Sequence, residues 1–262
     1  MNFLSRLTRR PRPDHSPTRE TLSEGAHFNS AARSHVGKVR SLNEDRFVEM
    51  PKAGVWAIAD GMGGHRAGDV AAQMLAEAVE RAVAGAAGPA TAERVAGAVH
   101  GVNAELLRMR RLHGQAGISG ATFIALIAGG GRYQVLWAGD SRAYRFRDGH
   151  CSRISRDHSV VQELIDAGVV APSAAASHPQ AHVVTRAVGA TKALHLEFSE
   201  GDIANGDLFL LCSDGLSDMI SPTALDAILD NASIELVADA LLSAALEAGA
   251  PDNVTFIVIK TS

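Results

Sequence analysis

The sequence predicts an α+β domain in which paired helices and hairpin-linked strands pack in layers. Two regions, at about 68–112 and 222–248, repeat apolar residues at helical spacing. Short apolar or alternating runs typical of strands lie around them, separated by turns that contain glycine or asparagine. The chain has 262 residues, 46% of them hydrophobic, so it can bury a sizeable core. We assign this folded domain to residues 28–262.

Residues 1–27 differ from the rest of the chain. They contain five arginines, three prolines and few large apolar residues. Such a segment cannot build its own packed core, so we expect a flexible arginine/proline-rich tail. It lacks the apolar stretch of about 7–15 residues found in signal peptides, and no run in the chain reaches the roughly 20 apolar residues of a membrane span. We therefore expect a cytoplasmic protein with no membrane span.

The first helical region divides into two helices, at about 68–84 and 91–112. The apolar stripe of the first is expected at Val70, Met74, Ala78 and Ala82. The stripe of the second is expected at Val95, Val99, Val102, Leu106 and Met109. Residues 85–89 separate the two helices, which we expect to pack as an antiparallel pair. The later helical stretch, about 222–248, is expected to break near Asn231.

The strand signals are short and mostly buried in character. They cover residues 55–59, 121–128, 132–138, 143–146, 194–198, 208–212 and 254–259. Asp148-Gly149 predicts a tight hairpin after one of them. The two tryptophans, Trp56 and Trp137, lie inside strand patterns and are expected in the core.

Overall charge excludes some functions. The net charge is −4 and 21% of residues are charged, whereas nucleic-acid-binding proteins usually carry a clear positive excess. We expect no nucleic-acid partner. Only two cysteines occur, so no disulfide framework is indicated. Nothing in the sequence indicates a fixed oligomer, and a monomer is the default.

Four aspartates sit at the ends of predicted strands beside glycine or asparagine. They occur in Asp60-Gly61, Gly139-Asp140, Asp214-Gly215 and Asp252-Asn253. If these carboxylates converge, they cannot all ionise without a cation. Such oxygen ligands select Mg²⁺, Mn²⁺ or Ca²⁺ rather than Zn²⁺. Each Asp-Gly alone is also an ordinary turn, and spacing does not show that the aspartates meet.

A series of motifs in order along the chain resembles a known family. They are Arg40-Ser41-Leu42-Asn43-Glu44-Asp45, Asp60-Gly61-Met62-Gly63-Gly64-His65, Ser119-Gly120-Ala121-Thr122, Gly139-Asp140-Ser141-Arg142, Asp157-His158-Ser159, Ser213-Asp214-Gly215 and Asp252-Asn253. In type and order they resemble the PPM (PP2C-type) metal-dependent protein serine/threonine phosphatases, in their bacterial form. The resemblance covers most of residues 28–262. It implies a four-layer αββα sandwich, with two antiparallel β-sheets flanked by helix pairs and an active site at one end.

The resemblance also implies a metal centre of two core Mn²⁺ or Mg²⁺ ions. Asp60 would bridge the two ions, and the carbonyl of Gly61 would complete one of them. Asp214 and Asp252 would bind the other. Asp140 would help Asp214 hold a third, weaker ion.

The remaining implied roles concern water and phosphate. Glu44 and Asp45 would act mainly through metal-bound waters, and Arg40 would grip the substrate phosphate with its guanidinium fork. A hydroxide bridging the two cations would attack phosphorus directly, without a phosphoenzyme. In agreement, neither cysteine is followed by the arginine of a Cys-x₅-Arg nucleophile loop.

One position departs from the animal members of the family, which carry a histidine general acid directly after Asp-Gly. Here that position is Met62, which cannot donate a proton. His65 is the nearest titratable substitute, either as an acid or only as part of the turn, and a water could be the acid instead. Residues 160–184 resemble the flap beside the bacterial active site, and residues 171–174 are typical of a loop.

The resemblance implies phosphoproteins as substrates, with Hanks-type Ser/Thr kinases and their targets as partners. Two alternatives stay open. One is a non-catalytic binding module of the same fold, although all the expected metal positions are filled. The other is a hydrolase of a small phosphorylated metabolite, because a metal core does not specify the leaving group.

Overall fold

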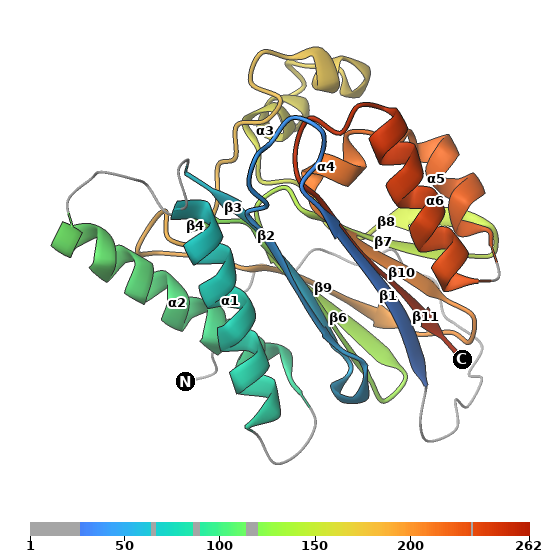
Figure 1. The fold of residues 1–262 in the computed structure, drawn as a ribbon, viewed down its shortest axis with the longest axis horizontal. Helices are drawn as coiled ribbons and strands as arrows, with labels where there is room; N and C mark the ends of the chain where they lie inside the picture. The colour runs from blue at the N-terminus through green and yellow to red at the C-terminus, as the bar shows by residue number, and fades with distance from the viewer. Residues whose placement is uncertain (1–26, 64–66, 86–89, 114–119, 232) are drawn as a thin grey trace.

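Two antiparallel sheets lie face to face in the middle of the molecule (Figure 1). The computed structural model describes residues 27–63, 67–85, 90–113, 120–231 and 233–262. The first sheet has the order β1 (Phe28–His35), β11 (Val254–Thr261), β10 (Leu208–Cys212), β7 (Arg142–Arg147) and β8 (His150–Arg153). The second has the order β2 (Asp45–Met50), β3 (Val55–Met62), β5 (Phe123–Gly129), β6 (Arg132–Ala138) and β9 (Glu197–Asp202), and β4 (Gly120–Ala121) also pairs with β3.

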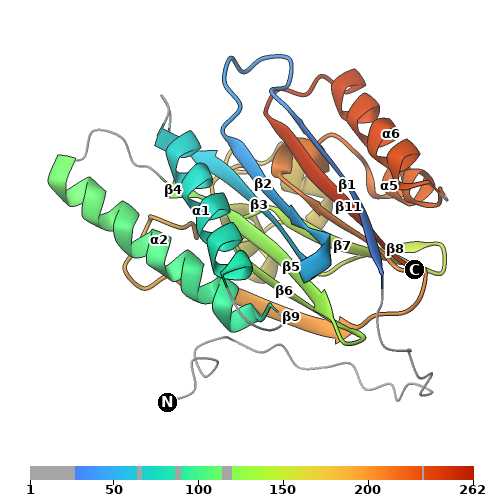
Figure 2. The same cartoon turned by 60° about the horizontal axis from the view of Figure 1, so that its bottom comes forward.

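Helices cover both outer faces of the sandwich (Figures 1 and 2). The second sheet is covered by α1 (Ala67–Ala84) and α2 (Ala92–His113). The first is covered by α5 (Pro222–Leu229) and α6 (Ile234–Glu247), with the short helix α4 (Asp214–Ser217) beside them. The predicted αββα architecture is therefore confirmed. No helix in the described ranges is both long and apolar enough to cross a membrane.

Three hydrophobic clusters hold the four layers together. Successive residues of β3 point to opposite faces, so Ala57 packs toward the helices α1 and α2 while Trp56 and Ile58 pack between the sheets. Opposite them lie residues of the other sheet such as Phe209 and Ile257, all fully or almost fully buried. Because both faces of these strands are covered, they are apolar almost throughout, as the sequence suggested.

The expected elements agree with the structure except in a few places. Strands β6 and β10 have their predicted bounds, and the helical stretch near the C-terminus breaks between α5 and α6 as expected. The two tryptophans are buried. The strand expected at 194–198 is found later, as β9, because residues 194 and 196 pack in the helix-side cluster before the strand begins.

The predicted stripe of α1 lies beside the centre of its buried face. Val70 is 42% exposed, Met74 and Ala78 are only partly buried, and the fully buried positions include Ala71, Ala72, Leu75 and Val79. The helix is rich in alanine, so more than one row of residues spaced by four looks apolar in the sequence, and packing against α2 and β3 selects the row one residue later.

The segment resembling a flap rises above one end of the sandwich (Figure 1, yellow). It contains α3 (Val160–Asp166), whose N-cap Ser159 accepts a hydrogen bond from the backbone N–H of Gln162. The run expected to be a loop instead forms the 3₁₀ helix η3 (Pro172–Ser177). Proline in the first turn accounts for this, because its fixed φ suits a helix start.

Candidate metal centre

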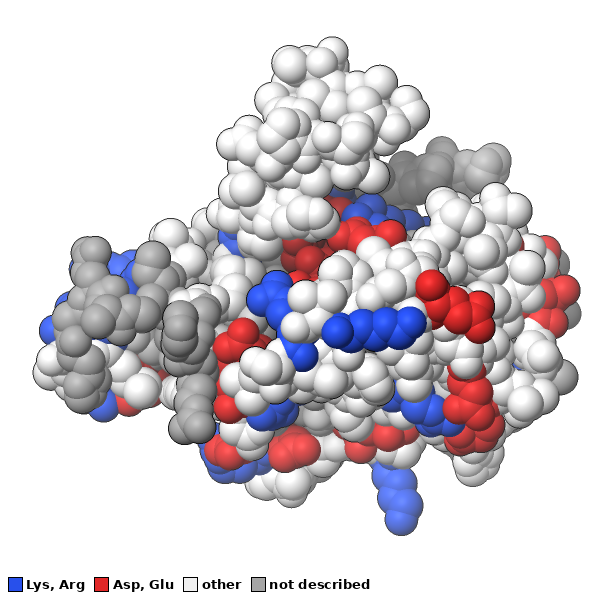
Figure 3. Space-filling model, turned by 45° about the horizontal axis from the view of Figure 1, so that its top comes forward, with Lys and Arg blue, Asp and Glu red and all other residues white. Residues whose placement is uncertain are grey.

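The predicted acidic residues meet at the end of the sandwich below this flap. Asp45 begins β2 and Asp60 lies near the end of β3, directly opposite each other in the β2–β3 pairing. Asp140 lies between β6 and β7, Asp214 follows β10, and Asp252 precedes β11. Figure 3 shows acidic side chains gathered in a hollow beneath the projecting segment. The five aspartates therefore lie at strand ends that meet at one end of the sandwich.

Hydrogen bonds hold the two facing aspartates in place. Ser213 Oγ donates to Asp45 Oδ2 at 3.0 Å in the buried space between the sheets. The backbone N–H of Thr122 donates to the carbonyl of Asp60 at 2.9 Å, and the Asp60 N–H donates to Thr122 Oγ1 at 3.3 Å. Thr122 Oγ1 in turn lies 2.7 Å from Ser141 Oγ. The glycine-threonine motif therefore fixes the backbone at Asp60.

A close backbone contact explains the glycine after Asp60. A Cβ atom at Gly61 would lie 2.4 Å from the carbonyl of Gly68 at the start of α1, and 2.7 Å from the carbonyl oxygen of Glu44. No larger residue fits without shifting the main chain. Gly61 thus lets the first turn of α1 and the Glu44 segment pack against the end of β3.

Asn253 ties the loop that carries Arg40 to the end of the sandwich. Its side-chain oxygen accepts a hydrogen bond from the Glu44 N–H at 2.8 Å, and its amide group donates to the carbonyls of Val36 and Leu42 at 2.9 Å each. Arg40 Nη2 lies 2.7 Å from Asp252 Oδ2. The arginine is 54% exposed, so it faces solvent beside the acidic cluster.

Electrostatics show how closely the carboxylates are gathered. Burial raises the pKa of Asp45 to about 7, and the charges of Asp214 and Asp252 add to this rise. Burial and the neighbouring charge of Asp214 likewise raise the pKa of Asp140 to about 7. The pKa of Asp214 rises to about 6, first through burial and then through acidic neighbours. For Asp60, burial followed by repulsion from Asp45 and Asp214 raises the pKa well above its ordinary value.

This donor set fits hard divalent cations. Within the described residues, no lysine or arginine forms an ion pair with Asp45, Asp60, Asp140 or Asp214. Glu44 Oε1 is buried and has no hydrogen-bond partner among those residues. A group of carboxylates that is desolvated and mutually repelling, with an unsatisfied oxygen beside it, is stabilised by Mg²⁺ or Mn²⁺.

His158 supports the Asp140 turn. Its ring Nδ1 accepts a hydrogen bond from the Gly139 N–H at 3.0 Å, and its backbone N–H donates to the Gly139 carbonyl at 2.9 Å. Its Nε2 lies 2.8 Å from a carboxylate oxygen of Glu197. Its ring stacks on Trp137. This histidine therefore positions the backbone before Asp140.

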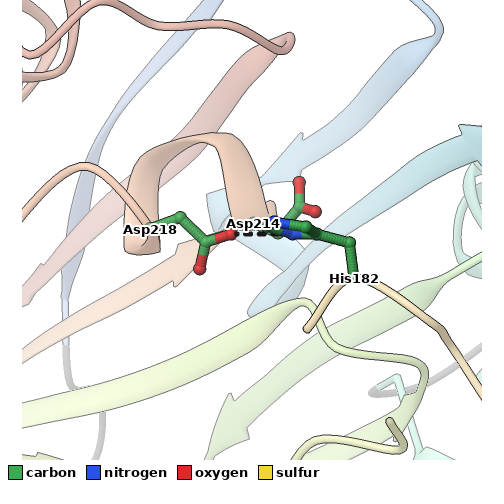
Figure 4. Close-up of side chains that lie close together, drawn as sticks. All are labelled: His182, Asp214 and Asp218. Atoms are coloured by element: carbon green, nitrogen blue, oxygen red, sulfur yellow. Dashed lines mark ion pairs between the residues drawn. The ribbon is translucent and has the colours of Figure 1, made fainter. Parts of the chain in front are cut away.

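His65 lies outside the described residues, and Met62 ends β3 opposite Gly120. Asp218, which the sequence analysis did not select, lies close to Asp214 and to His182 of the flap (Figure 4). The available signal was its position four residues after Asp214, one helical turn away.

The fold and the site together define a class of protein. It consists of αββα sandwiches that gather carboxylates at one end for divalent cations. A sequence model described as "Protein phosphatase 2C" matches residues 32–248. The chain therefore belongs to the protein phosphatase 2C family.

Individual relatives agree with this assignment. The chain is 36% identical over 228 residues to "Serine/threonine protein phosphatase PstP" of Mycobacterium tuberculosis, a match that covers 87% of this chain and 44% of that protein. This chain thus spans less than half the length of that relative. A structure titled "PppA, a key regulatory component of T6SS in Pseudomonas aeruginosa" superposes with a TM-score of 0.81 and 38% identity, covering 90% of this chain and 98% of that one. The catalytic domain of a PstP, in complex with two manganese ions, superposes with a TM-score of 0.82 and 32% identity, covering 90% and 99%.

Proposed function

We propose that this chain hydrolyses phosphoserine and phosphothreonine in proteins, using divalent cations held at the acidic end of the sandwich. The observation that carries the proposal is the convergence of five aspartates, those at 45, 60, 140, 214 and 252, in a member of the protein phosphatase 2C family. Relatives named serine/threonine protein phosphatases and a related catalytic domain with two bound manganese ions support it.

Two core ions, Mn²⁺ or Mg²⁺, would be held by residues of this acidic cluster. Asp60 would bridge them, and the Gly61 carbonyl would complete the shell of one. Asp214 and Asp252 would hold the other. Asp140, together with Asp214, would take part in a third and weaker site.

The remaining groups act around those ions. Glu44 and Asp45 would hold ordered water, for which the unsatisfied Glu44 oxygen is suitable. When bound, two divalent cations would supply a bridging water of lowered pKa that attacks phosphorus in line with the serine or threonine oxygen. Arg40 would exchange its ion pair with Asp252 for one with the substrate phosphate. A bound cation would neutralise the Asp252 carboxylate, and the guanidinium fork matches phosphate oxygens.

The leaving serine or threonine oxygen needs a proton. Met62 cannot supply it, so we propose His65 as the donor, with a metal-bound water as the alternative. The substrates would be phosphoproteins, including Hanks-type Ser/Thr kinases and their targets, so the reaction would reverse kinase signalling.

The test is hydrolysis of a phosphothreonine peptide with Mn²⁺ or Mg²⁺ added and then removed by chelation. Asp60→Asn and Asp214→Asn should each lower turnover by at least about 10²-fold, because each removes a group that holds the cations. Asp239→Asn is the matched control. This exposed aspartate lies on the outer helix α6 and pairs with Arg33 of β1. All variants are first checked for native-like circular dichroism.

Either of two results would reject the proposal: no phosphate release under any metal, or release that both site variants leave unchanged. A small phosphorylated metabolite tested in parallel separates the two substrate classes. Faster turnover of the metabolite than of the peptide would assign the site to metabolite hydrolysis.

A further inference from the structure

One imidazole ring connects the turn that carries Asp140 to strand β9 of the second sheet. His158 bonds to the Gly139 N–H through its ring Nδ1, at 3.0 Å, and to the Gly139 carbonyl through its backbone N–H, at 2.9 Å. Its other ring nitrogen, Nε2, lies 2.8 Å from Glu197 Oε2 at the start of β9. The His158 side chain is 7% exposed and that of Glu197 is 17% exposed, so water competes little for these bonds. Glu197 is therefore connected to the backbone beside a proposed cation ligand.

The Asp140 turn needs such support because its backbone conformation is unusual. Gly139 has φ of +119°, which favours glycine, and a Cβ there would lie 2.5 Å from Cβ of Thr122. On the other side of Asp140, Ser141 Oγ lies 2.7 Å from Thr122 Oγ1. The same Thr122 oxygen accepts the hydrogen bond of the Asp60 N–H. Asp140 thus lies between two attachment points, one at His158 and one that it shares with Asp60.

The hydrogen bonds determine which ring nitrogen of His158 carries the proton. A neutral imidazole has one N–H and one nitrogen without a proton. Because Nδ1 accepts the Gly139 N–H, Nδ1 has no proton and Nε2 carries it. The Nε2–H then donates to the Glu197 carboxylate. Stacking on Trp137, with 11° between the two ring planes, keeps the imidazole in the plane of these bonds.

A second group at Nε2 favours the opposite arrangement. Arg186 Nη1 lies 3.0 Å from His158 Nε2 and 3.8 Å from the same Glu197 oxygen. An arginine can only donate, so it bonds to Nε2 only when that nitrogen has no proton. The proton would then be on Nδ1, where it would face the Gly139 N–H, one donor against another. With Glu197 in place, its carboxylate accepts the Nε2–H and attracts the Arg186 charge.

We propose that Glu197 is a positioning residue of the metal centre, which keeps the proton of His158 on Nε2 so that Nδ1 holds the Gly139 N–H and thereby the Asp140 turn. The inference rests on the proposed function in one respect, because Asp140 is also a proposed cation ligand. Groups that orient metal ligands through an imidazole commonly change the affinity for the ion. Arg186 is compatible with this arrangement only while the Glu197 carboxylate is present.

The substitutions that test this differ in what they leave at Nε2. Glu197→Ala leaves Arg186 there as a donor and should move the proton to Nδ1. Glu197→Gln keeps a carbonyl oxygen that can accept the Nε2–H, so it should behave like the native protein. The double variant Glu197→Ala/Arg186→Leu removes the acceptor and the competing donor together. The Gly139 N–H should then return the proton to Nε2.

The first readout is the position of the proton in the metal-free protein at pH 7.5. Two-bond ¹⁵N–¹H correlation spectra of histidine-labelled protein distinguish the two tautomers, and His158→Gln identifies the His158 signals by their loss. The native protein, Glu197→Gln and the double variant should show Nε2–H, and Glu197→Ala should show Nδ1–H. Hydrogen exchange of the Gly139 amide should be at least about tenfold faster in Glu197→Ala than in the native protein, because its hydrogen bond is lost.

The second readout is the affinity for Mn²⁺ in isothermal titration, which needs no substrate. Glu197→Ala should lower the affinity of the weakest Mn²⁺ site about tenfold, and Glu197→Gln should change it by less than about twofold. Asp202→Ala is the matched control and should leave it unchanged, because this aspartate of β9 is 65% exposed and pairs with Arg132. All variants are first checked for native-like circular dichroism.

The double variant separates positioning from a merely structural role. It should bind Mn²⁺ more tightly than Glu197→Ala, although it lacks one more side chain. If Glu197 only stabilised the fold, removing Arg186 as well would add to the loss.

Any of four results would overturn the positioning role. They are a native His158 with its proton on Nδ1, a Glu197→Ala variant that keeps the proton on Nε2, a change of proton position that leaves the Mn²⁺ affinity unaltered, and a double variant that binds Mn²⁺ no better than Glu197→Ala. A coupled change of proton position and Mn²⁺ affinity, in a protein that hydrolyses no phosphopeptide, would support the positioning role and reject only the phosphatase proposal.

Discussion

Strand β10 has an aspartate near each end, and the two have opposite surroundings. Asp207 precedes the strand and is 1% exposed, and Arg147 donates hydrogen bonds of 2.6 and 2.5 Å to its two carboxylate oxygens. Asp214 follows the strand at the other end and lies among further carboxylates. Arg147 neutralises the first charge, whereas among the described residues no arginine or lysine forms an ion pair with Asp214.

The comparison shows two ways in which a folded protein buries a carboxylate, with and without a cationic side chain bonded to it. A buried carboxylate is tolerated where a hydrogen-bonded partner compensates for its lost hydration, as the bidentate arginine does for Asp207. At the other end, burial and repulsion raise the pKa of Asp60 well above its ordinary value. Burial and repulsion of these carboxylates lower the free energy of unfolding, and a bound divalent cation would restore it.

The largest expected effect comes from breaking the compensated pair. Arg147→Ala should lower the free energy of unfolding by about 3 kcal/mol, because the Asp207 carboxylate then stays buried without its partner. Urea denaturation measures this. Arg132→Ala is the matched control: its side chain is 47% exposed and its ion pairs lie at the surface, so it should cost less than about 1 kcal/mol. Equal losses in the two variants would show that the Arg147 pair is no stronger than a surface pair.

The second effect is a pH dependence of the metal-free protein. The pKa values of Asp45 and Asp140 rise from 3.8 to about 7, and that of Asp214 rises to about 6. Between pH 4 and 7 the folded state therefore binds more protons than the unfolded state, so stability is greatest near pH 4 and falls as pH rises. Because other groups also titrate, the prediction concerns the difference in the free energy of unfolding between the protein with Mn²⁺ and the protein without it.

Thermal unfolding with and without Mn²⁺ measures that difference. Stabilisation by saturating Mn²⁺ should grow by at least about 2 kcal/mol between pH 5 and 7.5, or about 4–8 °C in melting temperature. The ion requires deprotonated carboxylates, so its effect must increase with pH. A stabilisation independent of pH would show that these carboxylates are already ionised at pH 5.

The third prediction is that an Asp→Asn substitution changes the free energy of unfolding in opposite directions in the acidic cluster and in the Arg147–Asp207 pair. Without metal at pH 7.5, Asp60→Asn should stabilise the fold by about 1–2 kcal/mol, because the amide avoids the cost of burying or protonating a carboxylate. Asp207→Asn, the same change in the compensated pair, should destabilise it. With Mn²⁺ present, Asp60→Asn should lose its advantage because it lacks a ligand. Destabilisation by both variants in chelator would remove the distinction drawn between the two ends.

The sequence predicted the layers better than the details that depend on packing. Strand β10 was located correctly because its run is apolar on both faces, and β6 because Tyr133, Val135 and Trp137 alternate at period two. Strand β1 was missed because its residues, from Phe28 to His35, are largely polar or small, and only pairing with β11 defines it. The buried face of α1 could not be chosen from an alanine-rich pattern.

The candidate site shows the same limit. The motifs could name Asp60 and Asp214, but their convergence depends on strand register and on glycine contacts such as that of Gly61. Asp218 and its approach to His182 depend on the path of the flap, which no local pattern specifies. The roles of these residues as ligands stay predictions until a metal is measured.

The smallest expected effect concerns a hydrogen bond that helps the acidic end tolerate charge. Ser213 Oγ donates to Asp45 Oδ2, and this bond lowers the pKa of Asp45 against the dominant rise caused by burial. Ser213→Ala should make Asp45 harder to ionise and weaken Mn²⁺ binding about tenfold, as loss of a group that orients metal-site residues commonly does. Isothermal titration measures the affinity. Ser152→Ala, which removes a hydroxyl bonded to the Arg145 carbonyl on the β7–β8 hairpin, is the control and should leave it unchanged. Equal affinities for the two variants would mean that the Ser213 hydrogen bond to Asp45 does not contribute to cation binding.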